Sequence, residues 1–218
     1  MLDDELDRAL GTVEFEDAGF LAVTTFERDG DRAVLRFDLH TGVDGERPER
    51  WGVTCHGVEA FALSGGPASG VDVSDDDPAL WPLAHPSAQL FCGPVEPGRA
   101  DALLGALYRA HAEAVGEAAD AVPFGRGLNA VAAFDGGAGL VAEGPLPLLR
   151  VYRAALAAHG VETSIIGEVP PRRWDGQAFV PVPAELRVLL LGDCWVVAAA
   201  FEVARAREVG QQDPSPTI

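Results

Sequence analysis

The sequence contains no lysine, and arginine supplies all 16 of its basic side chains. Against them stand 34 aspartates and glutamates, so the formal net charge at pH 7 is −18. Binding to DNA, RNA or an anionic membrane requires clustered cations, and the arginines form no such cluster. We therefore expect neither a nucleic acid nor an anionic membrane as a partner. The absence of lysine also excludes a P-loop, which uses a lysine on the phosphates of its nucleotide.

Cysteine is scarce as well, with only Cys55, Cys92 and Cys194. They are far apart, lie in or beside apolar runs, and form no CxxC pair, which argues against a disulfide framework and a zinc site. We expect buried free thiols in a reducing cytoplasm. The acidic N-terminus, MLDDELDRAL, lacks the features of a signal peptide. No apolar run approaches the length of a bilayer, so we expect no membrane segment.

Two segments carry the spacing of amphipathic helices. The longer one, residues 98–119, places leucine, alanine and valine at steps of three and four, as at Leu103, Leu104 and Leu107. The second, residues 145–159, opens on prolines that the first turn of a helix tolerates, and Gly160 follows it as a stop. These are the two main helices of the predicted fold.

Most of the other patterned segments are typical of antiparallel strands. In residues 32–40, which follow a hairpin signal at 28–31, one face carries Ala33, Leu35, Phe37 and Leu39 and the other carries Val34, Arg36, Asp38 and His40. Residues 186–204 predict a C-terminal β-hairpin that turns at Gly192 and Asp193. The predicted fold class is α+β, an antiparallel sheet in one or two sections packed by the two helices, with helices on one side and acidic strands facing water.

The domain prediction is one α+β domain over residues 1–207, with a possible β-rich half at 1–95 and a second half at 96–207. Residues 208–218 are polar and contain prolines, which predicts a flexible tail.

One combination of residues could bind a small anion or take part in catalysis. Tyr108 and His111 lie three positions apart on the longer helix and therefore share a face. The segment PFGRGLN follows that helix and could fold back over the same face, bringing Arg126 and Asn129. The four side chains would supply a phenol, a proton carrier, a fixed cation and an amide. The alternative is a structural histidine and a surface arginine.

The sequence gives less support to a metal site than to this anion site. Asp38 and His40 share a strand face, and His56 lies on the next strand, but an exposed sheet face carries such residues by default. The acidic run 71–78, VDVSDDDP, lacks the alternating ligands and central glycine of an EF-hand and is better explained by helix capping at Ser74 or Asp75. We expect neither a metal nor a cofactor.

Trp81 and Trp174 stand in proline-rich segments, where aromatic side chains can anchor a protein partner. Strong acidity and the lack of an assembled catalytic motif predict a non-enzymatic cytoplasmic interaction protein, similar in role to an immunity, adaptor or inhibitor protein. The alternative is an enzyme or small anionic-ligand binder that uses Tyr108, His111, Arg126 and Asn129.

Overall fold

The computed structural model describes residues 4–10, 15, 18–43, 45–64, 66–174, 176–182 and 185–205. Helices and antiparallel strands confirm the α+β class. The chain divides into two compact units, residues 1–73 with 189–218 and residues 74–188. The C-terminal strands thus belong to the same unit as the N-terminal strands. The order of the sequence alone does not show this, because the unit is defined by contacts between distant residues.

The first unit is built on a four-stranded antiparallel sheet in the order β1-β2-β3-β13. Alternate residues of β2, Ala33 to Leu39, are buried, as the sequence pattern predicts. They pack with Trp51, Val53 and Cys55 of β3 into one core. The strands are β1 (Phe20–Asp29), β2 (Arg32–His40), β3 (Glu49–His56) and β13 (Ala200–Arg205), and a short helix, α1 (Asp4–Leu10), also belongs to this unit.

A second sheet has the order β4-β12-β11-β5. Its strands are β4 (Ala60–Ala62), β5 (Asp72–Ser74), β11 (Arg187–Leu191) and β12 (Cys194–Ala198), and the boundaries of the two units fall within β5 and β11. The predicted C-terminal hairpin is confirmed as β11 and β12, joined at Gly192 with its φ of +57°. Its second arm breaks at Ala199, where the chain leaves this sheet and enters the first one as β13.

The two main predicted helices are confirmed in the second unit. Helix α4 (Ala100–Val115) buries Leu103, Ala106 and Leu107 on one face, and a 3-10 turn, Gly116–Asp120, continues it. Helix α6 (Leu146–Ala158) carries Pro147 in its first turn, where the missing N–H costs no hydrogen bond. Its C-terminal end is closed by the Arg99 guanidinium, which donates to the His159 carbonyl at 2.6 Å.

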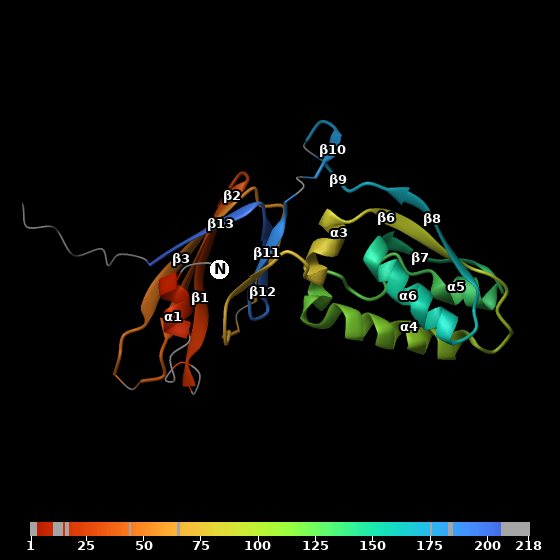
Figure 1. Cartoon of the computed structure of the whole chain (residues 1–218), viewed down its shortest axis with the longest axis horizontal. Helices are drawn as coiled ribbons and strands as arrows, with labels where there is room; N and C mark the ends of the chain where they lie inside the picture. The colour runs from red at the N-terminus through yellow and green to blue at the C-terminus, as the bar shows by residue number, and fades with distance from the viewer. Residues whose placement is uncertain are drawn as a thin grey trace, which may run out of the picture. The chain divides into compact units, whose positions relative to one another are not determined.

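The helices of this unit cover a three-stranded antiparallel sheet in the order β7-β6-β8. Its strands are β6 (Ser87–Cys92), β7 (Gly139–Pro145) and β8 (Thr163–Val169). Helix α6 contacts all three strands, α4 packs on α6, and α5 (Ala130–Asp135) packs on β7 and α4 (Figure 1). Trp81 begins a short helix, α3 (Trp81–Ala84), and residues 172–181 form a separate hairpin of β9 (Arg172–Trp174) and β10 (Phe179–Pro181).

The register of this sheet corrects the expectation of an acidic open face. Gln89 lies between Glu143 and Ile166, and Phe91 lies between Leu140 and Ser164. These two cross-strand rows carry one carboxylate, that of Glu143, among amide, hydroxyl and apolar side chains. The acidity of the chain is therefore not concentrated on these strands.

The outer edge of β7 is closed by the segment before α5. The Asn129 N–H donates to the Val141 carbonyl at 2.7 Å, and the Glu143 N–H donates to the Gly127 carbonyl at 2.9 Å. Leu128 completes a bridge to Ala142. Gly127 permits this close approach, because its φ is +70° and a Cβ there would collide with the Glu143 carbonyl.

Gly127→Ala is therefore expected to lower the free energy of unfolding by about 1–3 kcal/mol, since it adds a clash to backbone strain. Gly125→Ala is the matched control, because Gly125 also has a positive φ of +96° but has open space around its Cβ position. Urea unfolding of both variants measures the difference. Equal losses in the two variants would show that the Glu143 contact does not hold this edge.

Residues 208–218, predicted as a flexible tail, lie outside the described residues, as does Asp175 in the β9–β10 hairpin. Among the described helices, none combines the length and the apolar character that crossing a bilayer requires. The single-domain assignment over 1–207 stays a prediction.

Candidate functional site

His111 lies on the buried face of α4, only 4% exposed, one turn beyond Leu107. Its Nδ1 atom forms a hydrogen bond of 2.8 Å with the hydroxyl of Tyr152, which is buried on α6. This polar pair therefore joins the two main helices inside an otherwise apolar interface. The Nε2 atom is buried too and makes no hydrogen bond of standard geometry within the described residues.

Burial sets the protonation of this pair. It lowers the pKa of His111 below its ordinary value of 6.5, because the imidazolium would lose its hydration, and a weak hydrogen bond with the backbone of Val122 opposes this in part. Burial also raises the pKa of the Tyr152 hydroxyl. Both groups are neutral at pH 7, so the tyrosine hydroxyl donates to Nδ1 when Nε2 carries the ring proton.

The lowered pKa of His111 predicts a loss of stability on acidification. His111 takes up a proton near pH 6.5 in the unfolded chain and only at lower pH in the folded chain. The stability that depends on a neutral His111 is therefore complete above pH 6.5 and falls as the pH drops below 6.5. Urea unfolding at about pH 7 and about pH 5 measures the fall. We expect a smaller fall in His111→Gln, whose amide does not titrate. An equal fall in both proteins would contradict a neutral buried His111.

The segment after α4 folds back over this helix, as the sequence suggests it could. The Phe124 ring packs edge-on against Tyr108, with centroids 5.2 Å apart, and against His111, with centroids 5.3 Å apart. Tyr108 itself is 57% exposed and stands at the rim. Phe124 thus occupies the position next to both rings.

Arg126 and Asn129 make other contacts. Arg126 is exposed, and its backbone N–H donates to the Pro123 carbonyl. The Asn129 amide donates to the Leu140 carbonyl at 3.1 Å, which fastens it to the edge of β7. Tyr108 and His111 both contact the ring of Phe124. The side chain of Asn129 instead forms a hydrogen bond with the backbone of β7. Binding of an anion by the four residues stays a prediction.

The two candidate tryptophans differ in environment. Trp81 is partly buried at the first position of α3, rather than in an open loop. Trp174 is 58% exposed at the end of β9. It lies directly opposite Phe179 of β10, and their rings meet edge to face with centroids 5.2 Å apart.

This aromatic pair is conspicuous because each ring is half-exposed or more, with Phe179 at 67%. Two-residue alternation places Arg172 and Pro181 on the same face of the hairpin as the pair. The face therefore combines two rings, a proline and a guanidinium. Large rings in contact with water at the tip of a small hairpin are typical of a surface that a partner covers.

Sequence reasoning missed Tyr152 and Phe179. Tyr152 lies 41 positions after His111, and no spacing rule connects residues on two different helices. Phe179 had a usable signal, since Trp174 and Phe179 flank a short polar turn and a tight hairpin places such residues opposite each other.

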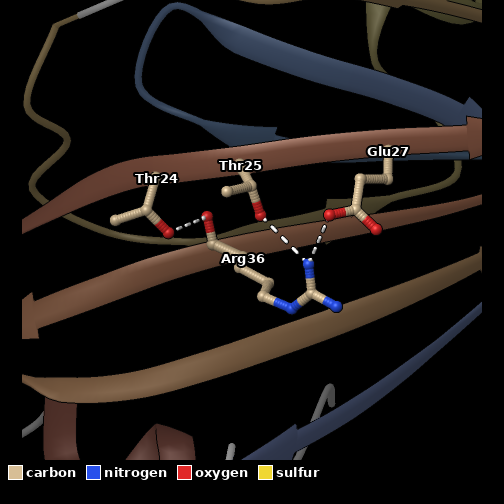
Figure 2. Close-up of polar contacts among 4 residues, drawn as sticks. All are labelled: Thr24, Thr25, Glu27 and Arg36. Carbon is tan, nitrogen blue, oxygen red and sulfur yellow. Dashed lines mark hydrogen bonds and ion pairs between the residues drawn. The ribbon is translucent and has the colours of Figure 1, made fainter.

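The outer face of the first unit's sheet carries paired charges. A β-bulge in β1 sets both Thr24 and Thr25 against Arg36 of β2. Figure 2 shows the Thr24 hydroxyl donating to the Arg36 carbonyl, while the guanidinium of Arg36 bonds Thr25 and Glu27 at 3.2 and 3.1 Å. An exposed ion pair of this kind contributes about 0.2–1 kcal/mol. It is a solvated face rather than a site.

The suggested metal ligands on this sheet are each engaged separately. Asp38 accepts from Arg50 at 3.1 Å, the His40 ring stacks on Phe20, and the His56 ring faces Glu202. Within the described residues, no group of three or more histidine, cysteine or acidic side chains is arranged to hold a metal.

The acidic run caps a helix, as the sequence favours, although the capping residue is neither Ser74 nor Asp75. The Asp77 carboxylate accepts from the Ala79 N–H at 2.8 Å and closes the 3-10 turn Pro78–Leu80. The three cysteines are buried and free, which confirms that part of the expectation, while a reducing cytoplasm stays a prediction. Burial raises the pKa of the Cys55 thiol to about 12, so it stays protonated and unreactive.

Comparison with known proteins finds no family model that matches the sequence, and no curated protein or solved structure that matches the chain.

Proposed function

We propose that this chain is a non-enzymatic interaction protein of the cytoplasm that binds a protein partner through the β9–β10 hairpin. The observation that supports this is the pair Trp174 and Phe179, which remain 58% and 67% exposed while packed against each other. Aromatic residues of this size dominate the binding energy of protein interfaces when a partner desolvates them. Buried free thiols support a reducing compartment.

The hairpin geometry favours a binding role over a structural one. The two rings pack edge to face against each other, and direct cross-strand pairing holds them opposite one another. A preorganised pair loses little side-chain entropy when a partner covers it. The strong negative charge of the chain adds long-range attraction for a partner of opposite charge.

The double substitution Trp174→Ala and Phe179→Ala is expected to abolish stoichiometric recovery of the partner. The measurement is native mass spectrometry of the tagged chain isolated gently from its own cells. Each hot-spot aromatic contributes about 2 kcal/mol or more, so the pair corresponds to roughly a thousandfold loss of affinity.

Val131→Ala is the matched control for this prediction, because Val131 is an exposed apolar side chain on α5 of the same unit. It should retain the partner. A partner bound equally by all three proteins would move the interface away from the hairpin, and a wild-type chain recovered as a bare monomer would contradict partner binding.

The second candidate is an enzyme or small anionic-ligand binder at Tyr108, His111, Arg126 and Asn129. It is supported by the packing of Phe124 against the first two rings, which brings the following segment over their helix. Binding at His111 would require neighbouring side chains to move, because the imidazole is only 4% exposed and Phe124 packs against it. The same mass spectra test this, since a small bound anion lost in Arg126→Ala, a substitution at an exposed side chain, would favour this candidate.

A further inference from the structure

The three-stranded sheet of the second unit has one closed edge and one open edge. Residues 127–129 bond the outer side of β7, as described above. Strand β8 forms the opposite edge, next to β6 (Figure 1). Within the described residues no backbone group is bonded to its outer side. An open edge presents N–H and C=O groups that can pair with another chain.

Edge strands are normally protected by lysine, proline or a charged residue turned inward. Strand β8, TSIIGEV, has no lysine, arginine or proline. It has two protecting features, the exposed carboxylate of Glu168 and a bulge at Gly167, where φ is +71° and the register with β6 shifts. The preceding residues Thr163–Ile166 pair regularly with Cys92–Gln89, so this half of the edge is straight enough to accept a further strand.

Apolar exposure is concentrated along the same part of the chain. Ile166 and Val169 of β8 are each 51% exposed, and the Trp174 and Phe179 pair follows within the next ten residues of sequence. An added strand at β8 would cover Ile166 and lie beside the segment that leads into the hairpin.

The charges at this edge are of one sign. Glu162 and Glu168 flank the regular stretch, both are exposed, and neither forms an ion pair with a described residue. Pairing β8 with a second copy of itself would bring together the glutamates of two chains that each carry a net charge of −18. An incoming strand with basic side chains would instead neutralise them.

We propose that β8 is a strand-addition site for an extended basic segment of a partner protein, in which lysine or arginine alternates with apolar residues. This rests on the proposed function, since it names how the partner docks. Main-chain hydrogen bonds to β8 supply affinity. Glu162 and Ile166 share a face of the edge, where the basic residues meet Glu162 and cover Ile166 with their aliphatic stems, and Glu168 adds negative charge at the same edge.

The test uses a short labelled peptide in which lysine alternates with valine, added to the full chain. One control peptide is N-methylated at alternate residues, which removes its strand-forming N–H groups and keeps its charge. We expect the unmodified peptide to bind about tenfold more tightly or better, which corresponds to ~1.4 kcal/mol. Hydrogen exchange should slow in residues 163–166 and in no other strand.

The double variant Glu162→Gln and Glu168→Gln should weaken binding severalfold and leave the exchange of the free chain unchanged. Glu96→Gln and Glu113→Gln together are the matched control, since they remove the same charge from elsewhere in the unit. Equal binding of the methylated peptide, slowed exchange away from β8, or no binding overturns strand addition. Protection of β8 that rises with protein concentration alone overturns the basic partner in favour of a second copy.

These outcomes are separable from those of the proposed function. The hairpin variant could lose the cellular partner while the basic peptide fails to bind β8. That pair of results would keep the hairpin as the interface and would remove β8 from it.

Discussion

Replacing His111 with alanine is expected to lower the free energy of unfolding by about 2–5 kcal/mol. The ring is 4% exposed and fills the interface of α4 and α6, so its removal leaves a cavity. It also leaves the buried Tyr152 hydroxyl without its 2.8 Å partner, which adds a desolvation cost. Urea unfolding, followed by circular dichroism of the helices, measures the loss.

Tyr152→Phe is the control that separates the cavity from the hydrogen bond. It removes the hydroxyl and keeps the ring, so the expected loss is smaller, about 1–2 kcal/mol. A His111→Ala loss no larger than that of Tyr152→Phe would mean that the histidine ring does not fill the interface. It would also reopen the possibility that His111 faces a ligand.

Replacing Leu149 with alanine is expected to cost about 2–5 kcal/mol. Leu149 is fully buried on α6, the helix that contacts α4 and all three strands of its sheet. The cavity therefore lies at the centre of the second unit, where few neighbours are free to move into it. Thermal and urea unfolding of the variant give the loss.

Leu63→Ala is the matched substitution, because Leu63 is 41% exposed and loses the same atoms. Its expected effect is within about 0.5 kcal/mol. Similar losses for the two leucines would contradict the packing of α6 between α4 and the sheet.

The sequence predicts secondary structure and burial best where one face of a single helix or strand packs against the core. The alternation of β2 and the leucine spacing of α4 each report burial directly, because local geometry fixes which side chains share a face. The break at Ala199 was not predicted, since the apolar residues on both sides of it suit either sheet. The two units also escape prediction, because distant contacts define them.

The candidate sites show the same limit. The i, i+3 spacing correctly groups Tyr108 with His111, yet it cannot show that Tyr152, on another helix, is the histidine's hydrogen-bond partner. A proline-rich setting identified both Trp81 and Trp174, but only the structure separates them by exposure and finds Phe179 against the second. Exposure depends on the packing of whole elements, so residue type alone does not predict it.

The most direct test of partner binding through the β9–β10 hairpin is hydrogen exchange of the chain in complex with the partner recovered from its own cells. Slower exchange in residues 163–181 than in the free chain is the expected result, with β8 and the hairpin protected together. Protection confined to α4 and the segment 121–129 would contradict it, and would place function at Tyr108 and His111 instead.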